Sequence, residues 1–303
     1  MNTHSMPLTS IIITTHNRPQ LLPRAVESAF AAGANVEVIV VDDASTDETA
    51  AVCRELSGIK YVRVERNQRV AGARNLGVLV SNGEYLTFLD DDDLRVPGSL
   101  DAQVKRLAAN PEAGLVYGQA VLVNQSGKAT TRFYPNDCPE GDVFWQLLGR
   151  NFIPCGSAVF RRSCLDRVGL LDHVLAGIDD WDLWIRIAEL YPIVALPEPV
   201  LHWRQSTPSS QQGTSQAAAI VSQSVRQFRQ IWERLPRAAN SPEIQQAWRR
   251  FSANMGAHLS TEVLRSLRHR RLAQATKNLF ALMNLGPSVW FRLLRVNDAY
   301  SPL

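Results

Sequence analysis

Short apolar runs rich in β-branched residues alternate with segments of helical period over the first hundred residues. The apolar runs cover residues 10–15, 36–41, 59–65 and 85–89, and the helical segments between them cover residues 20–32, 46–56 and 71–81. Each helical segment is long enough to cross from one strand to a parallel neighbour. The pattern therefore predicts an α/β fold with a mostly parallel central sheet and helices on both of its faces.

The boundaries of these elements carry their own signals. Ser45 and Glu48 have the spacing of a capping box, which predicts that Ser45 opens the second helix. Beyond residue 93 the rhythm changes, and the pattern predicts a hairpin that turns around Ser126 and Gly127. It also predicts helices at 99–109, 141–149 and 180–190 and a short strand at 157–161.

From about residue 215 the sequence is helical in pattern to its end and has no strand signals. A polar stretch, RQSTPSSQQGTS at 204–215, separates this part from the α/β part. We therefore expect a catalytic domain over residues 1–205 and a C-terminal helical extension over residues 206–303.

Composition excludes several classes of protein. The chain has 303 residues, and 32 basic against 29 acidic side chains give a net charge of +3, which is too mild to indicate nucleic-acid binding. No apolar run of about 18 residues is present, and the first ten residues do not resemble a signal peptide, so we expect a cytoplasmic protein. Its four cysteines are too few and too scattered for a disulfide framework, and we expect them to be reduced.

Polar residues follow the predicted strands directly, at the sheet edge where ligands bind in open parallel sheets. Four consecutive aspartates, residues 90–93, follow the fourth strand and would repel one another unless a cation or solvent intervened. All-oxygen ligands favour Mg²⁺ or Mn²⁺ over zinc. The alternative is a solvated acidic turn that precedes a helix.

Two other strand ends carry candidate binding groups. Asp42 and Asp43 end the second strand, although either could simply help begin the helix that follows. The segment VAGARNLG introduces a helix with small residues, so its backbone can approach a phosphate and Arg74 can neutralise it. Alternatively, Arg74 is only a charge on the helix surface.

A second acidic cluster lies in IDDWDLWIRI, at residues 178–187. Asp179 and Asp180 stand at the start of a predicted helix, where a carboxylate is stabilised and could serve as a general base. Trp181 and Trp184 could hold a sugar ring, although the spacing of Trp184 on an amphipathic helix favours a place in the core.

Several common motifs are absent from the sequence: GxGxxG after the first strand, GxxxxGK[ST], HExxH and GxSxG. Dinucleotide-dependent enzymes, P-loop NTPases, zincins and α/β-hydrolases are therefore disfavoured.

Taken together, segments spanning about residues 8–205 resemble the family 2 glycosyltransferases, which have the GT-A fold. The matching segments, all in the same order, are IIITTHNRP, VVDDASTDET, GARNLG, YLTFLDDDDLRVP, GSAVFRR, VGLLD and DDWDLWIRI. The resemblance implies transfer of a sugar from a nucleotide diphosphate donor to a hydroxyl acceptor, with inversion at the anomeric carbon.

The resemblance also implies roles for individual residues. Asp92 would be a ligand of Mn²⁺ or Mg²⁺, and Asp180 would act as the base with Asp179 as its neighbour. The nucleotide would be bound by the remaining residues at the strand ends: Thr14, Thr15, Asn17, Asp42, Arg74, Asp90 and Asp91. A pyrimidine nucleotide, UDP or dTDP, is expected because a carboxylate at Asp42 can accept the ring N3–H of uracil or thymine.

Two competing functions remain open at this point. A sugar nucleotidyltransferase would carry a glycine-rich basic loop after the first strand, where this chain has THNRP. A non-catalytic sugar-nucleotide-binding protein would be expected to lack one of the two acidic clusters. The acceptor, a saccharide or a lipid-linked saccharide, is not readable, and the stretches LFALMNLG and SVWFRLL could either lie on a membrane surface or pack as ordinary helices.

Overall fold

The computed structural model describes residues 8–124, 128–204 and 217–285, which divide into two compact units. The first unit contains residues up to 143 and from 152 to 205, and the second contains residues 144–151 and those from 206 onwards. The short segment 144–151 thus belongs with the C-terminal unit, although it lies within the predicted catalytic stretch of the sequence.

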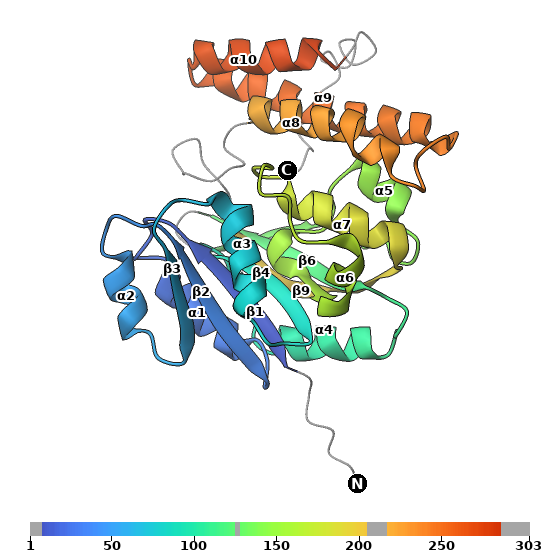
Figure 1. The fold of residues 1–303 in the computed structure, drawn as a ribbon. Coiled ribbons are helices and arrows are strands. Elements are labelled where there is room, and N and C mark those ends of the chain that lie inside the picture. The colour runs from blue at the N-terminus through green and yellow to red at the C-terminus, as the bar shows by residue number, and fades with distance from the viewer. Residues whose placement is uncertain (1–7, 125–127, 205–216, 286–303) are drawn as a thin grey trace. The chain divides into compact units, whose positions relative to one another are not determined.

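The first unit contains a single mixed sheet (Figure 1). Its strands are β1 (Thr9–Thr15), β2 (Val36–Asp43), β3 (Ile59–Val64), β4 (Tyr85–Asp90), β5 (Leu94–Arg95), β6 (Leu115–Val123), β7 (Ala129–Tyr134), β8 (Ala158–Arg161) and β9 (Ile193–Arg204). Its helices are α1 (Leu22–Ala31), α2 (Thr49–Glu55), α3 (Arg69–Val80), α4 (Ser99–Ala108), α6 (Leu165–Val168) and α7 (Asp179–Leu190), with short 3₁₀ turns η1 (Cys155–Ser157) and η2 (Arg162–Cys164).

The strand order is β3-β2-β1-β4-β8-β6-β9-β5, with β7 paired to β6. The first four strands are mutually parallel, as their alternation with helices predicts. Strand β8 runs antiparallel to both β4 and β6, whereas β6 and β9 are parallel. The predicted hairpin is the antiparallel β6–β7 pair, and its expected turn residues, Ser126 and Gly127, lie outside the described residues.

Side chains alternate across the sheet as strand geometry requires. Ile11 and Ile13 of β1 belong to the core cluster formed with α1 and α4. Ile12 points to the opposite face, where a Cβ placed on Gly77 of α3 would lie 2.3 Å from its Cγ2. Glycine at position 77 therefore allows α3 to pack directly on β1.

Strand β9 is an element that the sequence pattern does not predict. Its Pro197 and Pro199 cannot donate ladder hydrogen bonds, and the pairing of β9 with β6 shifts register around Gly118 and Gln119. Such irregularities accommodate proline in a strand. Strand β9 ends at Arg204, beside the acidic run.

The capping box predicted at Ser45 is wrong. Helix α2 begins at Thr49, and its first turn is held by Asp47, whose Oδ1 accepts the Thr49 backbone N–H at 2.9 Å. The Ser45 hydroxyl instead accepts the backbone N–H of Asn17 at 3.0 Å, which links the loops after β1 and β2.

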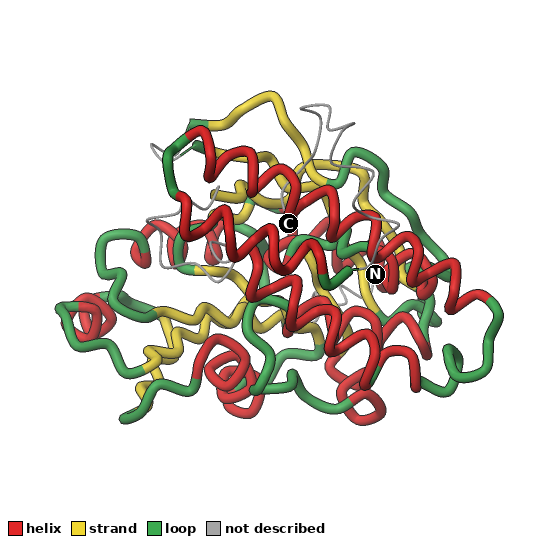
Figure 2. Tube along the Cα trace, turned by 90° about the horizontal axis from the view of Figure 1, so that it is seen from above, coloured by secondary structure: helices red, strands yellow, loops and turns green. Residues whose placement is uncertain are grey.

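The second unit is helical, which confirms the C-terminal helical extension. It contains α5 (Phe144–Gly149), α8 (Ala217–Gln230), η4 (Trp232–Arg234), α9 (Glu243–Arg268) and α10 (Leu272–Met283). Helices α8, α9 and α10 pack side by side (Figures 1 and 2). Ring contacts of Phe228 and Trp232 with Phe251 join α8 and η4 to α9. In the described part of the chain, no helix has an apolar stretch sufficient to span a bilayer.

Candidate active site

The candidate site is built where β1, β2 and β4 end at one edge of the sheet. Register places Thr15 opposite Asp42 and Thr14 opposite Asp90. The polar residues predicted at the strand ends are therefore brought together, because parallel neighbours present their carboxyl ends at the same edge.

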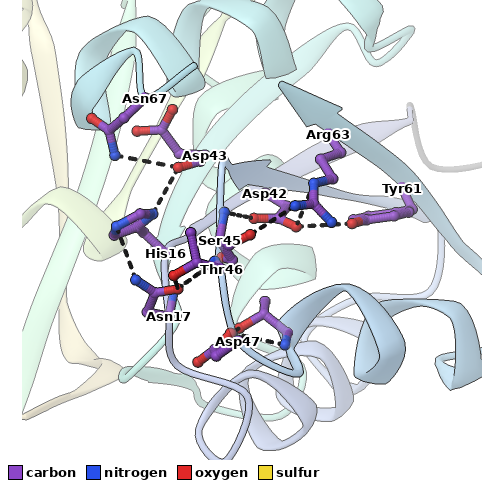
Figure 3. Close-up of polar contacts among 11 residues, drawn as sticks. His16, Asn17, Asp42, Asp43, Ser45, Thr46, Asp47, Tyr61, Arg63 and Asn67 are labelled. Carbon is purple, nitrogen blue, oxygen red and sulfur yellow. Dashed lines mark hydrogen bonds and ion pairs between the residues drawn. The ribbon is translucent and has the colours of Figure 1, made fainter. Parts of the chain in front are cut away.

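Asp42 is fully buried and held by partners on three sides (Figure 3). Its Oδ1 accepts the Ser45 backbone N–H at 2.9 Å, and its Oδ2 accepts the Tyr61 hydroxyl at 2.9 Å. Arg63 Nε lies 3.7 Å from Oδ2, and Arg63 is the register partner of Asp42 on β3. Tyr61 and Arg63 were not predicted as site residues, although their i, i+2 spacing places both on one face of β3.

The loops after β1 and β2 are connected by reciprocal hydrogen bonds around Asn17. Asn17 has a positive φ of 55°, and its Oδ1 accepts the backbone N–H of Thr46 at 2.8 Å. His16 Nδ1 lies 2.7 Å from the backbone oxygen of Asp43 (Figure 3). The side chain of Asn17 thus shapes this edge of the site as well as facing it.

Asp43 is directed toward the next loop. Its Oδ1 accepts the backbone N–H of Gln68 at 2.6 Å, just before α3 begins. Burial raises the pKa of Asp43 above its ordinary value. Asp43 therefore anchors the start of α3 and not of α2.

Asp91 is separated from the rest of the acidic run by its own partners. It accepts the Thr15 hydroxyl at 2.7 Å and pairs with Arg18 at 2.8 Å. Burial raises the pKa of Asp91 to about 7, against the opposing effect of the Arg18 charge. Arg18, which was not predicted as a site residue, reaches this run from the loop after β1.

Asp90, Asp92 and Asp93 form the group that could hold a metal ion. One carboxylate oxygen of each lies within 4.8 Å of the others. Three carboxylate oxygens are a suitable donor set for Mg²⁺ or Mn²⁺. Burial and the neighbouring carboxylates raise the pKa of Asp93 well above its ordinary value.

Arg204, the last residue of strand β9, contacts Asp92 and Asp93. The backbone N–H of Arg204 donates to Asp93 Oδ1 at 2.8 Å, and its Nε donates to the backbone oxygen of Asp92 at 3.1 Å. These contacts were not predicted, because the strand that carries Arg204 was not predicted.

Arg74 connects the two acidic clusters. It is buried on α3 and donates to Asp90 Oδ1 at 2.7 Å and to Asp179 Oδ2 at 2.8 Å. Its guanidinium also lies 5.3 Å from the centre of the Phe88 ring. The alternative that Arg74 is only a surface charge is therefore wrong.

Asp179 and Asp180 have different surroundings at the start of α7. Asp179 is buried against Arg74. Asp180 is partly exposed, and its Oδ1 accepts the backbone N–H of Trp181 at 2.7 Å. Burial, followed by the charge of Asp179, raises the pKa of Asp180 to about 7. The two carboxylates thus differ in their partners, because Asp179 is paired with Arg74 and Asp180 accepts a backbone N–H.

Both tryptophans of this segment are buried. Trp184 is fully buried with its ring 5.5 Å from that of Phe160, which confirms its place in the core. Trp181 is 2% exposed. An acceptor role for either ring stays a prediction and would require a rearrangement that exposes one face.

The cysteines form no disulfide bonds with one another. All four are free thiols, and Cys53 and Cys164 are buried. Cys155 lies close to Arg74 and to both acidic residues of α7, where burial raises its thiol pKa well above the ordinary value. A thiol that stays protonated is not a nucleophile, so the site offers carboxylates and not thiolates for chemistry.

Residues 10–169 match the family described as glycosyl transferase family 2. An uncharacterized glycosyltransferase of Bacillus subtilis, YwdF, is 30% identical over 199 residues, which cover 62% of this chain and 70% of YwdF. The succinoglycan biosynthesis protein ExoU of Rhizobium meliloti is 30% identical over 193 residues, covering 58% of this chain and 55% of ExoU. The chain spans between 28% and 71% of the length of its relatives named as uncharacterized glycosyltransferases.

Two solved structures share the fold, which confirms the predicted GT-A architecture. The mannosyltransferase PcManGT of Pyrobaculum calidifontis, in complex with GDP-Man and Mn²⁺, has a TM-score of 0.59 at 20% identity, with 97% of this chain and 89% of that chain covered. S. aureus TarS, residues 1–349 in complex with UDP, has a TM-score of 0.54 at 15% identity, with 97% and 94% covered.

The Arg74 bridge makes a prediction about stability. Replacing Arg74 with Met leaves the buried Asp179 without its counter-ion, and we expect the free energy of unfolding to fall by about 3–5 kcal/mol in urea denaturation at pH 7. Lowering the pH to about 5 should recover part of the loss, because Asp179, once unpaired, takes up a proton and loses its charge.

Arg106→Met is the matched control, since its pair with Glu140 is exposed on both sides. We expect it to cost no more than about 1 kcal/mol. Equal losses in the two variants would show that the Arg74 bridge does not stabilise the site.

Proposed function

Because the chain belongs to glycosyl transferase family 2, we propose that it moves a sugar from a nucleotide diphosphate donor to a hydroxyl acceptor, with inversion at the anomeric carbon. The observation that carries the proposal is the Arg74 bridge, which brings the acidic run after β4 next to the acidic pair of α7. An inverting transfer requires a group that stabilises the leaving diphosphate and a base that faces the acceptor.

Asp180 is the proposed general base. Its carboxylate takes the proton of the acceptor hydroxyl while the acceptor oxygen forms its bond to the anomeric carbon. The bond from that carbon to the diphosphate oxygen breaks, and its electron pair leaves with the nucleoside diphosphate. Displacement from the face opposite the leaving group inverts the stereochemistry and needs no covalent nucleophile.

Asp179 is proposed to position the base. It is held by Arg74 at 2.8 Å, and its negative charge contributes to the raised pKa of Asp180. A base with a pKa near the working pH is well matched to proton transfer.

A divalent cation, Mn²⁺ or Mg²⁺, is proposed to be held by Asp92 with Asp90 and Asp93. When bound, it would supply positive charge beside the diphosphate. Arg18, which lies 3.2 Å from Asp92 Oδ2, limits the repulsion among these carboxylates and helps to orient Asp92.

The nucleotide is proposed to lie over the ends of β1 and β2. Thr14, Thr15 and Asn17 would line its pocket, and Asp90 or Asp91 would face the ribose. Asp42 is proposed to accept the N3–H of uracil or thymine, which requires its carboxylate, fully buried here, to become accessible to the base. The UDP complex of TarS supports a pyrimidine nucleotide, whereas the GDP-Man complex of PcManGT supports a guanine nucleotide as the alternative.

The acceptor is proposed to be a saccharide, free or linked to a lipid, in polysaccharide or glycoconjugate synthesis. The likeness to ExoU, named for succinoglycan biosynthesis, supports this class. A nucleotidyltransferase is disfavoured because the loop after β1 lacks glycine, and a non-catalytic binding protein is disfavoured because both acidic clusters are intact. A cytoplasmic location stays a prediction.

The assignment of Asp180 as the general base is tested by the Asp180→Asn variant. We expect kcat to fall by roughly 10²- to 10⁴-fold with the donor Kd nearly unchanged, because proton removal occurs only in the chemical step. The carboxylate acts in its ionised form, so wild-type kcat should rise with pH through about 7, and the variant should lose this rise.

Asp179→Asn is the matched comparison and should lower kcat less than Asp180→Asn does. A larger loss at Asp179 would move the base by one residue. Turnover close to wild type in both variants would remove the acidic pair from the mechanism.

The metal site is tested by Asp92→Asn, which keeps the size of the side chain and removes its charge. Calorimetric titration with UDP should show tighter binding with Mn²⁺ than without it in the wild type. The variant should lose this Mn²⁺-dependent increase in UDP affinity, because a neutral amide is a much weaker ligand for a hard cation than a carboxylate is. Asp137→Asn, in the loop after β7, should keep it. Metal-dependent affinity that persists in Asp92→Asn would contradict the assignment.

The base of the nucleotide is tested by competition among UDP, dTDP, CDP and GDP. We expect UDP or dTDP to bind about tenfold more tightly than CDP, which lacks the ring N–H that a carboxylate can accept. Asp42→Asn should reduce the difference in affinity between UDP and CDP, because a side-chain amide can both donate and accept a hydrogen bond. A clear preference for GDP would overturn the pyrimidine assignment.

A further inference from the structure

The last two helices of the C-terminal unit expose large apolar side chains to solvent. Six of the thirteen exposed large hydrophobic residues in the described chain lie on them. We call this surface the α9–α10 face and define it by Leu264, Leu267, Leu272, Leu279, Phe280 and Met283.

The exposed stripe on α10 is separate from its packed side. Leu272, Leu279 and Met283 follow one another at intervals of seven and four residues, so they lie along one side of the helix, with Phe280 beside them. The opposite side carries Ala275, Asn278, Ala281 and Leu282, which are buried against the rest of the unit. Ordinary helical packing therefore accounts for only part of the LFALMNLG stretch, while SVWFRLL lies outside the described residues.

The same surface is strongly cationic. Arg268, Arg270, Arg271 and Lys277 are exposed, His269 is exposed among them, and Arg265 is exposed but pairs with Glu262. No acidic residue occurs in the sequence between Glu262 and Asp298. Arg270 has a positive φ of 56° in the tight turn between the helices, which groups Arg268, Arg270 and Arg271 at the end of the helical pair.

An open groove extends the apolar surface toward α8. It has a volume of about 470 Å³ and is lined by Ala218, Ala219, Ser222, Thr276, Lys277 and Phe280. A cation and an aromatic ring thus border an apolar hollow within the same unit.

We propose that the α9–α10 face docks on an anionic lipid surface, with Leu272, Phe280 and Met283 entering the headgroup boundary and the arginines meeting lipid phosphates. Apolar side chains flanked by Arg and Lys are the combination that binds the interface of anionic bilayers. A second copy of the chain is a poorer occupant, because two such faces would bring like charges together.

Docking goes beyond the proposed sugar transfer and does not depend on it. If both hold, the enzyme works at the surface where lipid-linked saccharides are found, which favours the lipid-linked acceptor over the free one.

The test is cosedimentation of the full chain with vesicles of phosphatidylcholine, pure or mixed with phosphatidylglycerol. We expect binding to the mixed vesicles that weakens as salt is raised, and little binding to the neutral ones. Absence of binding to anionic vesicles would overturn the proposal.

Two double variants separate charge from apolar contact. Arg270→Glu with Arg271→Glu, and Leu272→Ser with Phe280→Ser, should each weaken binding by at least about tenfold, since each removes one part of the interaction. All four side chains are exposed, so the fold should survive, and circular dichroism checks this. Undiminished binding in both variants would overturn the assignment to this face.

Matched controls come from the other unit. Arg24→Glu with Arg54→Glu makes the same change of charge on exposed residues of α1 and α2, and Leu79→Ser removes an exposed leucine of α3. We expect both control variants to bind vesicles as the wild type does. If they lost as much binding as the variants of the α9–α10 face, the loss would reflect net charge or overall hydropathy and not this face. A dimer in sedimentation equilibrium that Leu272→Ser with Phe280→Ser dissolves, without vesicle binding, would assign the face to a second copy instead.

Transfer to a water-soluble acceptor is measured in parallel on the wild type and the Arg270→Glu with Arg271→Glu variant. Vesicle binding without transfer would leave docking standing and reject the proposed function. Transfer without vesicle binding would support the proposed function and reject docking.

Discussion

The buried guanidinium of Arg74 is the interaction on which the rest of the site depends. A parallel sheet brings the ends of its strands to one edge, and this chain places carboxylates at several of those ends, where they repel one another in a poorly solvated setting. Arg74 lies between Asp90 of β4 and Asp179 of α7 and compensates both. Two elements that are far apart in the sequence are thereby held together.

The remaining negative charge is divided among partners from separate segments. Thr15 at the end of β1 and Arg18 of the following loop hold Asp91. Tyr61 and Arg63 of β3 hold Asp42, and the backbone of Arg204 holds Asp93. Each carboxylate therefore has a distinct environment although four of them are consecutive in sequence. Asp180 and the group of Asp90, Asp92 and Asp93 are the carboxylates proposed to meet external partners, a proton in one case and a cation in the other.

The two units differ in the chemistry that they present. The first concentrates acidic groups at a sheet edge, where their charges are compensated internally. The second carries its cations on the surface, next to apolar side chains that its own core does not use. A unit that buried those leucines would gain stability from the hydrophobic effect, so their exposure is better explained by a partner than by folding.

The sequence by itself determined the elements whose signals are local. Periods of two and 3.6 residues predicted β1 to β4, the helices between them and the helical C-terminal part, and the order of polar residues after the strands predicted which carboxylates gather. Tertiary structure alone decided how each of them is held. Strand β9 was missed because its prolines oppose a strand locally, and only pairing with β6 stabilises it. Ser45 joins two loops instead of capping a helix, and Arg18, Tyr61, Arg63 and Arg204 acquire roles only through neighbours that are distant in the sequence. The physical reason is that helix and strand periodicity arises within a few residues, whereas the pairing of buried charges depends on which segments the fold brings into contact.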